Sequence, residues 1–155
     1  MSDPLPSVLV VEDHARVTQL MVRFLREQGN VEVWGAVLTA EEALAKLAEA
    51  SQGASGSETA TRSADGQLPD LVLVDVSLPG MSGIELVGEL SRLYPEVPCL
   101  MLSAHPNLTY VQKALDNGAR GYVIKGYPEV ILEGIRRVLA GEIYLSAEIG
   151  RMMDR

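Results

Sequence analysis

Five short segments, four of them continuously apolar and one largely so, alternate along this chain with segments in which apolar residues recur at helical spacing. The apolar runs cover residues 8–11, 31–37, 71–74, 100–102 and 122–124, and a helical stripe follows each of them. Strands that are apolar on both faces and separated by helices are typical of a parallel sheet covered by helices on both sides. The pattern therefore predicts an α/β fold with a doubly wound, five-stranded parallel sheet, for which we expect the strand order 2-1-3-4-5.

The alternation occupies most of the 155 residues, a length that fits one domain, and we expect this domain at residues 6–141. Residues 51–68 interrupt it with small polar residues, so a flexible polar insertion is expected there, at the amino ends of the strands. Residues 142–155 are expected to begin a C-terminal linker helix, and Ser146 is placed to cap it.

The composition limits the partners of the chain. The formal net charge of −8 repels a phosphate backbone, so DNA binding by this segment itself is not expected. Cys99 is the only cysteine, which excludes an intramolecular disulfide. No apolar run approaches the ~20 residues of a membrane span, and the first residues lack the pattern of a secretion signal. We therefore expect a cytoplasmic protein without membrane contact.

Polar side chains follow four of the five apolar runs at the point where each run ends. They are Glu12 and Asp13, then Asp75, Ser103 and Lys125. Ligands of an open parallel sheet bind beyond the carboxyl ends of its strands, so these side chains are expected to meet in one crevice. Three carboxylates there repel one another, so either their pKa values rise or a cation neutralises them, and oxygen ligands suit Mg²⁺. A carboxylate nucleophile, a hard cation, an ammonium and a hydroxyl together predict a phosphoryl-transfer site.

Each of these residues alone has an ordinary explanation, because acids favour helix starts and lysines favour the surface. Their occurrence at four strand ends is what favours a site. In addition, the segments VLVVEDH, LVLVDVSLPGMSGIEL, CLMLSAH and GARGYVIKG resemble the signature segments of two-component response-regulator receiver domains. The segment IRRVLAGEIYLSAEI resembles the last receiver helix and linker of the NarL/FixJ-type subfamily. The resemblance implies the flavodoxin-like receiver fold.

The resemblance also implies roles for the residues of the crevice. Asp75 corresponds to the phosphoacceptor, and Lys125 to the lysine that pairs with the phosphoryl group. Glu12 and Asp13 correspond to the acidic pair that holds Mg²⁺ together with Asp75 and the backbone carbonyl of Ser77.

A second group of residues corresponds to the conformational switch of the family. Ser103 matches the hydroxyl that moves toward the phosphoryl group, and Tyr122 matches the aromatic ring that turns inward on activation. Ser77 and His105 occupy positions that tune the lifetime of the aspartyl phosphate. Gly126 departs from the family pattern, which often has proline after the lysine.

The function implied is that of a signalling switch, which catalyses only its own phosphorylation and dephosphorylation. A sensor histidine kinase donates the phosphoryl group, and the phosphorylated form is expected to homodimerise to a modest extent. The NarL/FixJ-type linker implies control of a helix-turn-helix DNA-binding domain that this chain lacks. The alternative is a stand-alone receiver that acts through protein partners. A Mg²⁺-dependent phosphohydrolase is disfavoured, because such enzymes carry a second aspartate where Ser77 stands.

Overall fold

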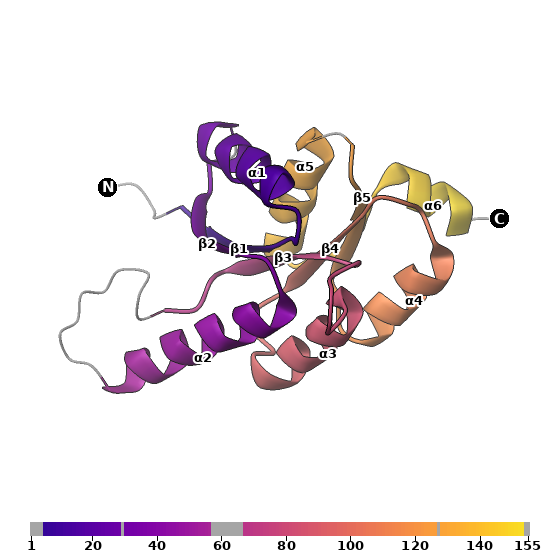
Figure 1. Cartoon of the computed structure of the whole chain (residues 1–155). Helices are drawn as coiled ribbons and strands as arrows, with labels where there is room; N and C mark the ends of the chain where they lie inside the picture. Colours follow the sequence, from indigo (N-terminus) through magenta and orange to yellow (C-terminus); the bar gives the residue numbers. More distant parts are fainter. Residues whose placement is uncertain (1–4, 29, 57–66, 127, 154–155) are drawn as a thin grey trace.

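Six parallel strands form one sheet in the computed structural model, which describes residues 5–28, 30–56, 67–126 and 128–153 (Figure 1). Across the sheet they are β2 (Glu32–Val37), β1 (Ser7–Val11), β3 (Leu71–Asp75), β4 (Cys99–Ser103), β5 (Gly121–Ile124) and β6 (Tyr144–Leu145). The α/β class and the predicted order of the first five strands are confirmed, but the prediction of five strands is wrong by one. The added strand, β6, has only two residues, too few to form an apolar run in the sequence.

Within the described residues, six helices cover the two faces of the sheet. One face carries α1 (Ala15–Gln28) and α5 (Pro128–Leu139), and the other carries α2 (Ala40–Gly56), α3 (Gly83–Leu93), α4 (Leu108–Asp116) and α6 (Ala147–Met153) (Figure 1). Successive strand residues point to opposite faces, so Val8 and Val10 pack under α1 and α5 whereas Leu9 and Val11 pack toward α2 and α3. None of the helices in these ranges is long and apolar enough to cross a bilayer.

The central strands β3 and β4 are buried along their whole length, which explains why they are apolar on both faces. Cys99, at the start of β4, is 1% exposed and belongs to the cluster on the α3 side. After β3 the chain turns into α3 through a capping box. The Ser82 hydroxyl accepts a hydrogen bond from the Glu85 amide, and the Glu85 carboxylate accepts one from the Ser82 amide. This box fixes where α3 begins relative to the end of β3.

The polar segment 51–68 is helical in its first part, because α2 continues to Gly56. Residues 57–66 lie outside the described residues. On the far side, the indole of Trp34 donates a hydrogen bond to the carbonyl of Gln67 at 2.9 Å, and Leu68 packs against the core. Both ends of the segment lie at the amino ends of the strands, as predicted, and therefore away from the carboxyl ends.

The C-terminal residues pack onto the sheet. Ile149 of α6 is fully buried, and Ser146 just before α6 is 5% exposed. The predicted side-chain cap by Ser146 is wrong: its hydroxyl has no hydrogen-bond partner among the described residues, and its backbone carbonyl accepts from the Gly150 amide instead.

Candidate functional site

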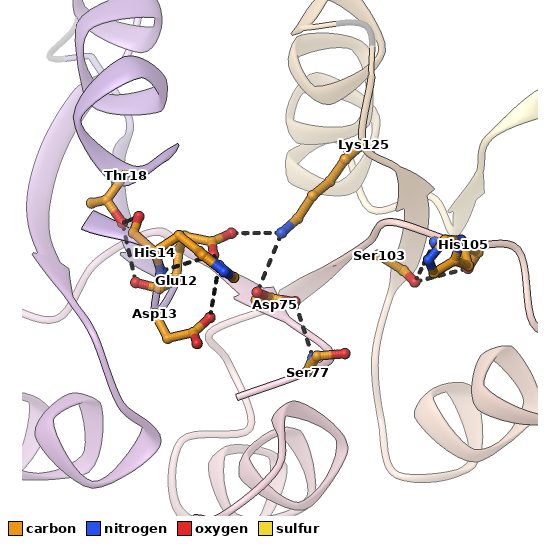
Figure 2. A network of polar contacts seen from close by, with 9 residues as sticks. All are labelled: Glu12, Asp13, His14, Thr18, Asp75, Ser77, Ser103, His105 and Lys125. Atoms are coloured by element: carbon orange, nitrogen blue, oxygen red, sulfur yellow. Dashed lines mark hydrogen bonds and ion pairs between the residues drawn. The ribbon is translucent and has the colours of Figure 1, made fainter. Parts of the chain in front are cut away.

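The polar residues that follow the strands lie at the same end of the sheet, because parallel strands in register end together. Val11 pairs with Val74, and Asp75 with Leu102, which aligns the ends of β1, β3 and β4. Figure 2 shows the resulting group of side chains above the carboxyl ends. We call this group the strand-end site, and it comprises Glu12, Asp13, Asp75, Ser103 and Lys125.

Lys125 links two carboxylates at the centre of the strand-end site. Its ammonium lies 2.7 Å from Oε1 of Glu12 and 3.2 Å from Oδ2 of Asp75 (Figure 2). Glu12 is fully buried and Asp75 nearly so, whereas a quarter of the Lys125 side chain remains exposed. Burial alone would lower the pKa of Lys125, but the two carboxylates outweigh it and raise the pKa above its ordinary value. The lysine is therefore a stable positive charge beside Asp75.

The carboxylates form a cluster with the composition of a cation site. Glu12, Asp13, His14 and Asp75 each offer one ligand atom, and these atoms lie within 4.8 Å of one another. One oxygen of Asp13, Oδ1, is buried and makes no hydrogen bond within the described residues, although Nδ1 of His14 lies 3.3 Å from it. Because most of these donors are carboxylate oxygens, the set fits Mg²⁺.

His14 was not among the predicted site residues, although its position directly after the acidic pair is the signal that could have found it. Its Nδ1 lies 3.2 Å from Glu12 and 3.3 Å from Asp13. The hydrogen bond to Glu12, together with the charge of Asp13, raises the pKa of the imidazole. The side chain is 70% exposed, so it lies at the rim of the cluster.

The backbone after β3 holds the Asp75 carboxylate in place. The Ser77 amide donates a hydrogen bond to Oδ1 of Asp75 at 3.0 Å, so the two carboxylate oxygens have different partners. The first residue of α3, Gly83, lies so close to this turn that a side-chain carbon there would overlap the carbonyl oxygen of Asp75. The turn therefore requires glycine at this position.

Ser103 faces the loop after β4 rather than Asp75. Its hydroxyl donates to the carbonyl oxygen of His105 at 2.8 Å and accepts from the His105 amide at 3.2 Å (Figure 2). Both bonds involve the His105 backbone. The structure thus places Ser103 at the strand-end site but leaves its hydroxyl in a local turn.

Tyr122 lies inside the protein, on the face of β5 toward α4. Its ring is fully buried, and its hydroxyl has no hydrogen-bond partner in the described part of the chain. Burial raises the pKa of the phenol, and the nearby Ser103 hydroxyl opposes this only in part. After Lys125 the chain turns through Gly126 with φ of +143°, a backbone conformation that favours glycine.

Comparison with known proteins agrees with this geometry. The model of the response regulator receiver domain matches residues 8–136, a range that contains the whole strand-end site. The chain is 33% identical to the transcriptional activator protein ExaE of Pseudomonas putida, over 94% of this chain and 61% of ExaE. It is 30% identical to the response regulator UvrY of Escherichia coli, over 95% of this chain and 60% of UvrY. The chain thus spans less than two thirds of the length of these relatives.

A solved structure shares the fold as well. It is the response regulator receiver domain protein (CheY-like) from Methanospirillum hungatei, which superposes with a TM-score of 0.71 at 28% identity. The superposition covers 88% of this chain and 95% of that one, so the two proteins share nearly the complete sheet and its helices.

Proposed function

This chain belongs to the response regulator receiver domain family, and we propose that it accepts a phosphoryl group on Asp75 from a sensor histidine kinase. One observation carries the proposal. The buried Asp75 carboxylate lies at a sheet end where a lysine ammonium and two further carboxylates converge on it. This arrangement matches the chemical needs of an aspartyl phosphate: a nucleophile, a fixed positive charge and ligands for a hard cation.

The transfer is a displacement at phosphorus. The bond from phosphorus to the histidine nitrogen of the kinase breaks, its electron pair stays on that nitrogen, and a carboxylate oxygen of Asp75 forms the new bond. The Ser77 amide holds one Asp75 oxygen, and Lys125 offsets negative charge on the transferred group. Glu12, Asp13, Asp75 and the Ser77 carbonyl would hold Mg²⁺. When bound, this ion supplies further positive charge for the phosphoryl oxygens.

We further propose that Ser103 and Tyr122 form the switch. To reach a phosphoryl group on Asp75, the Ser103 hydroxyl would leave its bonds to the His105 backbone. Because Ser103 neighbours the phenol of Tyr122, its movement changes the space available to the ring. The ring, which is already buried in this structure, would then be held in its inward position, with consequences for the surface around α4, β5 and α5.

We propose that Ser77 and His105 tune the lifetime of the phosphoryl group on Asp75. The bonds of Ser103 go to the backbone of His105, so His105→Ala keeps them and removes only the imidazole. We expect this change to alter the rate at which phosphorylated protein decays. An unchanged decay rate in a time course of intact mass would contradict the role of the imidazole.

We propose that the receiver controls the output domain of a longer regulator. ExaE is a transcriptional activator, and this chain corresponds to about three fifths of it. We propose that the receiver acts in the cytoplasm and controls a helix-turn-helix DNA-binding domain, partly by phosphorylation-dependent homodimerisation. Equal sedimentation with and without beryllofluoride, a phosphoryl analogue, would count against the dimer. A stand-alone receiver that acts on protein partners is the alternative.

The proposal is tested by intact-mass measurement after incubation with acetyl phosphate, with and without Mg²⁺. The wild type is expected to gain one phosphoryl group only when Mg²⁺ is present, and Asp75→Asn is expected to gain none. Asp70→Asn is a matched control, because Asp70 bonds Ser7 at the opposite end of the sheet. A phosphoryl gain in Asp75→Asn equal to that of the wild type would refute the assignment.

A further inference from the structure

Residues 144–153 pack beside Tyr122 at the edge of the sheet. β6 adds to the sheet beyond β5, and its Leu145 lies opposite Tyr122 in the pairing of the two strands. The Ser146 amide donates a hydrogen bond to the Tyr122 carbonyl at 3.1 Å. Ile149 of α6 is fully buried in the same hydrophobic cluster as the Tyr122 ring. Figure 1 shows α6 beside β5 and α4.

This cover changes what Tyr122 can do. Without β6, β5 would be the last strand of the sheet, and Tyr122 would lie on an edge strand. With them in place the ring is 0% exposed. An outward turn of the ring past β6 and α6 would require residues 144–153 to move away from the sheet.

Two buried hydroxyl groups oppose the docking of residues 144–153 on the sheet. The hydroxyls of Tyr122 and Ser146 are both buried, and neither has a hydrogen-bond partner among the described residues. Buried hydroxyls without partners destabilise the arrangement that buries them. In addition, α6 has only seven residues, and Ile149 is its single buried one. Docking of α6 itself consequently depends on one buried side chain, and the short strand β6 holds the rest of the segment on β5.

We propose that residues 144–153 form a C-terminal latch that is docked when Tyr122 points inward and released when the ring turns outward. The inference rests on the proposed function for its signal, because phosphorylation of Asp75 is what favours the inward ring. Coupling between two sites is reciprocal, so phosphorylation tightens the latch and a docked latch favours the phosphorylated form. The latch thereby carries the state of Asp75 to the C-terminal end of the receiver.

The first experiment separates the latch from the ring. Ile149→Asp places a charge in the buried contact and should release the latch, whereas Ile143→Asp makes the same change at a side chain that is 63% exposed. Tyrosines are labelled with 3-fluorotyrosine, and the Tyr122 signal is assigned by its loss in Tyr122→Phe. Broadening by a soluble gadolinium chelate should reach Tyr122 in Ile149→Asp but not in Ile143→Asp. If Ile149→Asp does not fold, Ile149→Ala is measured in the same way, with increased broadening of Tyr122 expected.

The second experiment measures the reciprocal effect in the wild type. Beryllofluoride and Mg²⁺ should slow hydrogen exchange at the Ser146 and Gly150 amides by about fivefold or more. Occupancy of Asp75 is followed separately through the fluorine signal of bound beryllofluoride. If beryllofluoride binds and the exchange rates of the Ser146 and Gly150 amides do not change, the latch proposal is wrong. It is also wrong if a folded variant exchanges these amides freely while Tyr122 stays buried. If beryllofluoride does not bind at all, the proposed function is contradicted instead. The first experiment then tests the coupling between the latch and Tyr122 by itself.

Discussion

The ammonium of Lys125 lies closer to Glu12, at 2.7 Å, than to Asp75, at 3.2 Å. Glu12 also makes the larger contribution among those that raise the pKa of Lys125. In the unphosphorylated protein, Glu12 therefore anchors the lysine, and Asp75 shares it. A phosphoryl group on Asp75 would compete with Glu12 for this ammonium. The strength of the ion pair between Glu12 and Lys125 would therefore determine how readily Lys125 moves to the phosphoryl group.

Lys125→Met is expected to lower the free energy of unfolding at neutral pH by about 1–3 kcal/mol, because Oε1 of the buried Glu12 carboxylate loses its cation and only Oε2 keeps a partner, His14. The pKa of Lys125 is raised above 10.5 in the folded chain. Its contribution is thus fully present below pH 10.5 and is lost as pH rises through the folded-state pKa. In denaturant titrations at increasing pH, the difference in stability between the two proteins should begin to shrink above pH 10.5. Lys113→Met, on the exposed side of α4, is the control, and parallel curves for Lys125→Met would contradict the pairing.

Asp13→Asn is expected to stabilise the protein in the absence of divalent cations. The strand-end site gathers three carboxylates around one ammonium, and the buried oxygen of Asp13 makes no hydrogen bond within the described residues. Where the exposed His14 beside it is neutral, removing the Asp13 charge relieves repulsion on the order of 1 kcal/mol. Added Mg²⁺ should raise the Tm of the wild type and leave that of Asp13→Asn nearly unchanged. Asp116→Asn, an exposed acid on α4, should respond to Mg²⁺ as the wild type does. An equal response to Mg²⁺ in Asp13→Asn would exclude Asp13 as a ligand.

Gly83→Ala is expected to destabilise the fold by about 1–3 kcal/mol, because the added methyl group overlaps the carbonyl oxygen of Asp75 and must push α3 or the turn aside. Gly88→Ala is the matched control on the same helix, since its nearest neighbour would lie 3.6 Å away. There alanine should stabilise α3 by about 0.5–1 kcal/mol. Denaturant unfolding gives both values, and phosphorylation by acetyl phosphate should fall only in Gly83→Ala. Similar stability of the two variants would show that the turn tolerates a side chain.

The sheet and the convergence of the strand-end site could be predicted from the sequence because both follow from parallel topology. An apolar run that must be buried on both faces ends where its first polar residue stands, as at Asp75 and Lys125. The register of the strands then brings those residues together without any knowledge of the side-chain packing.

Features that depend on tertiary contact could not be predicted in this way. β6 forms because Tyr144 and Leu145 pair with the free edge of β5, and the hydrophobic pattern of these two residues does not predict a strand. The orientation of the Ser103 hydroxyl depends on the turn at His105, and the approach of His14 to the acidic pair depends on its rotamer. Hydrophobic periodicity carries no information on such contacts.

The position of Cys99 has a practical consequence. Burial raises the pKa of its thiol to about 12, so in the folded protein the group stays protonated and unreactive toward oxidants and alkylating reagents. β4, which carries it, lies directly beside β3. Because it is the only thiol in the chain, its modification rate at high reagent concentration counts the opening events of the central sheet. Cys99 is therefore a natural probe of the rate at which the sheet opens next to the strand that carries Asp75.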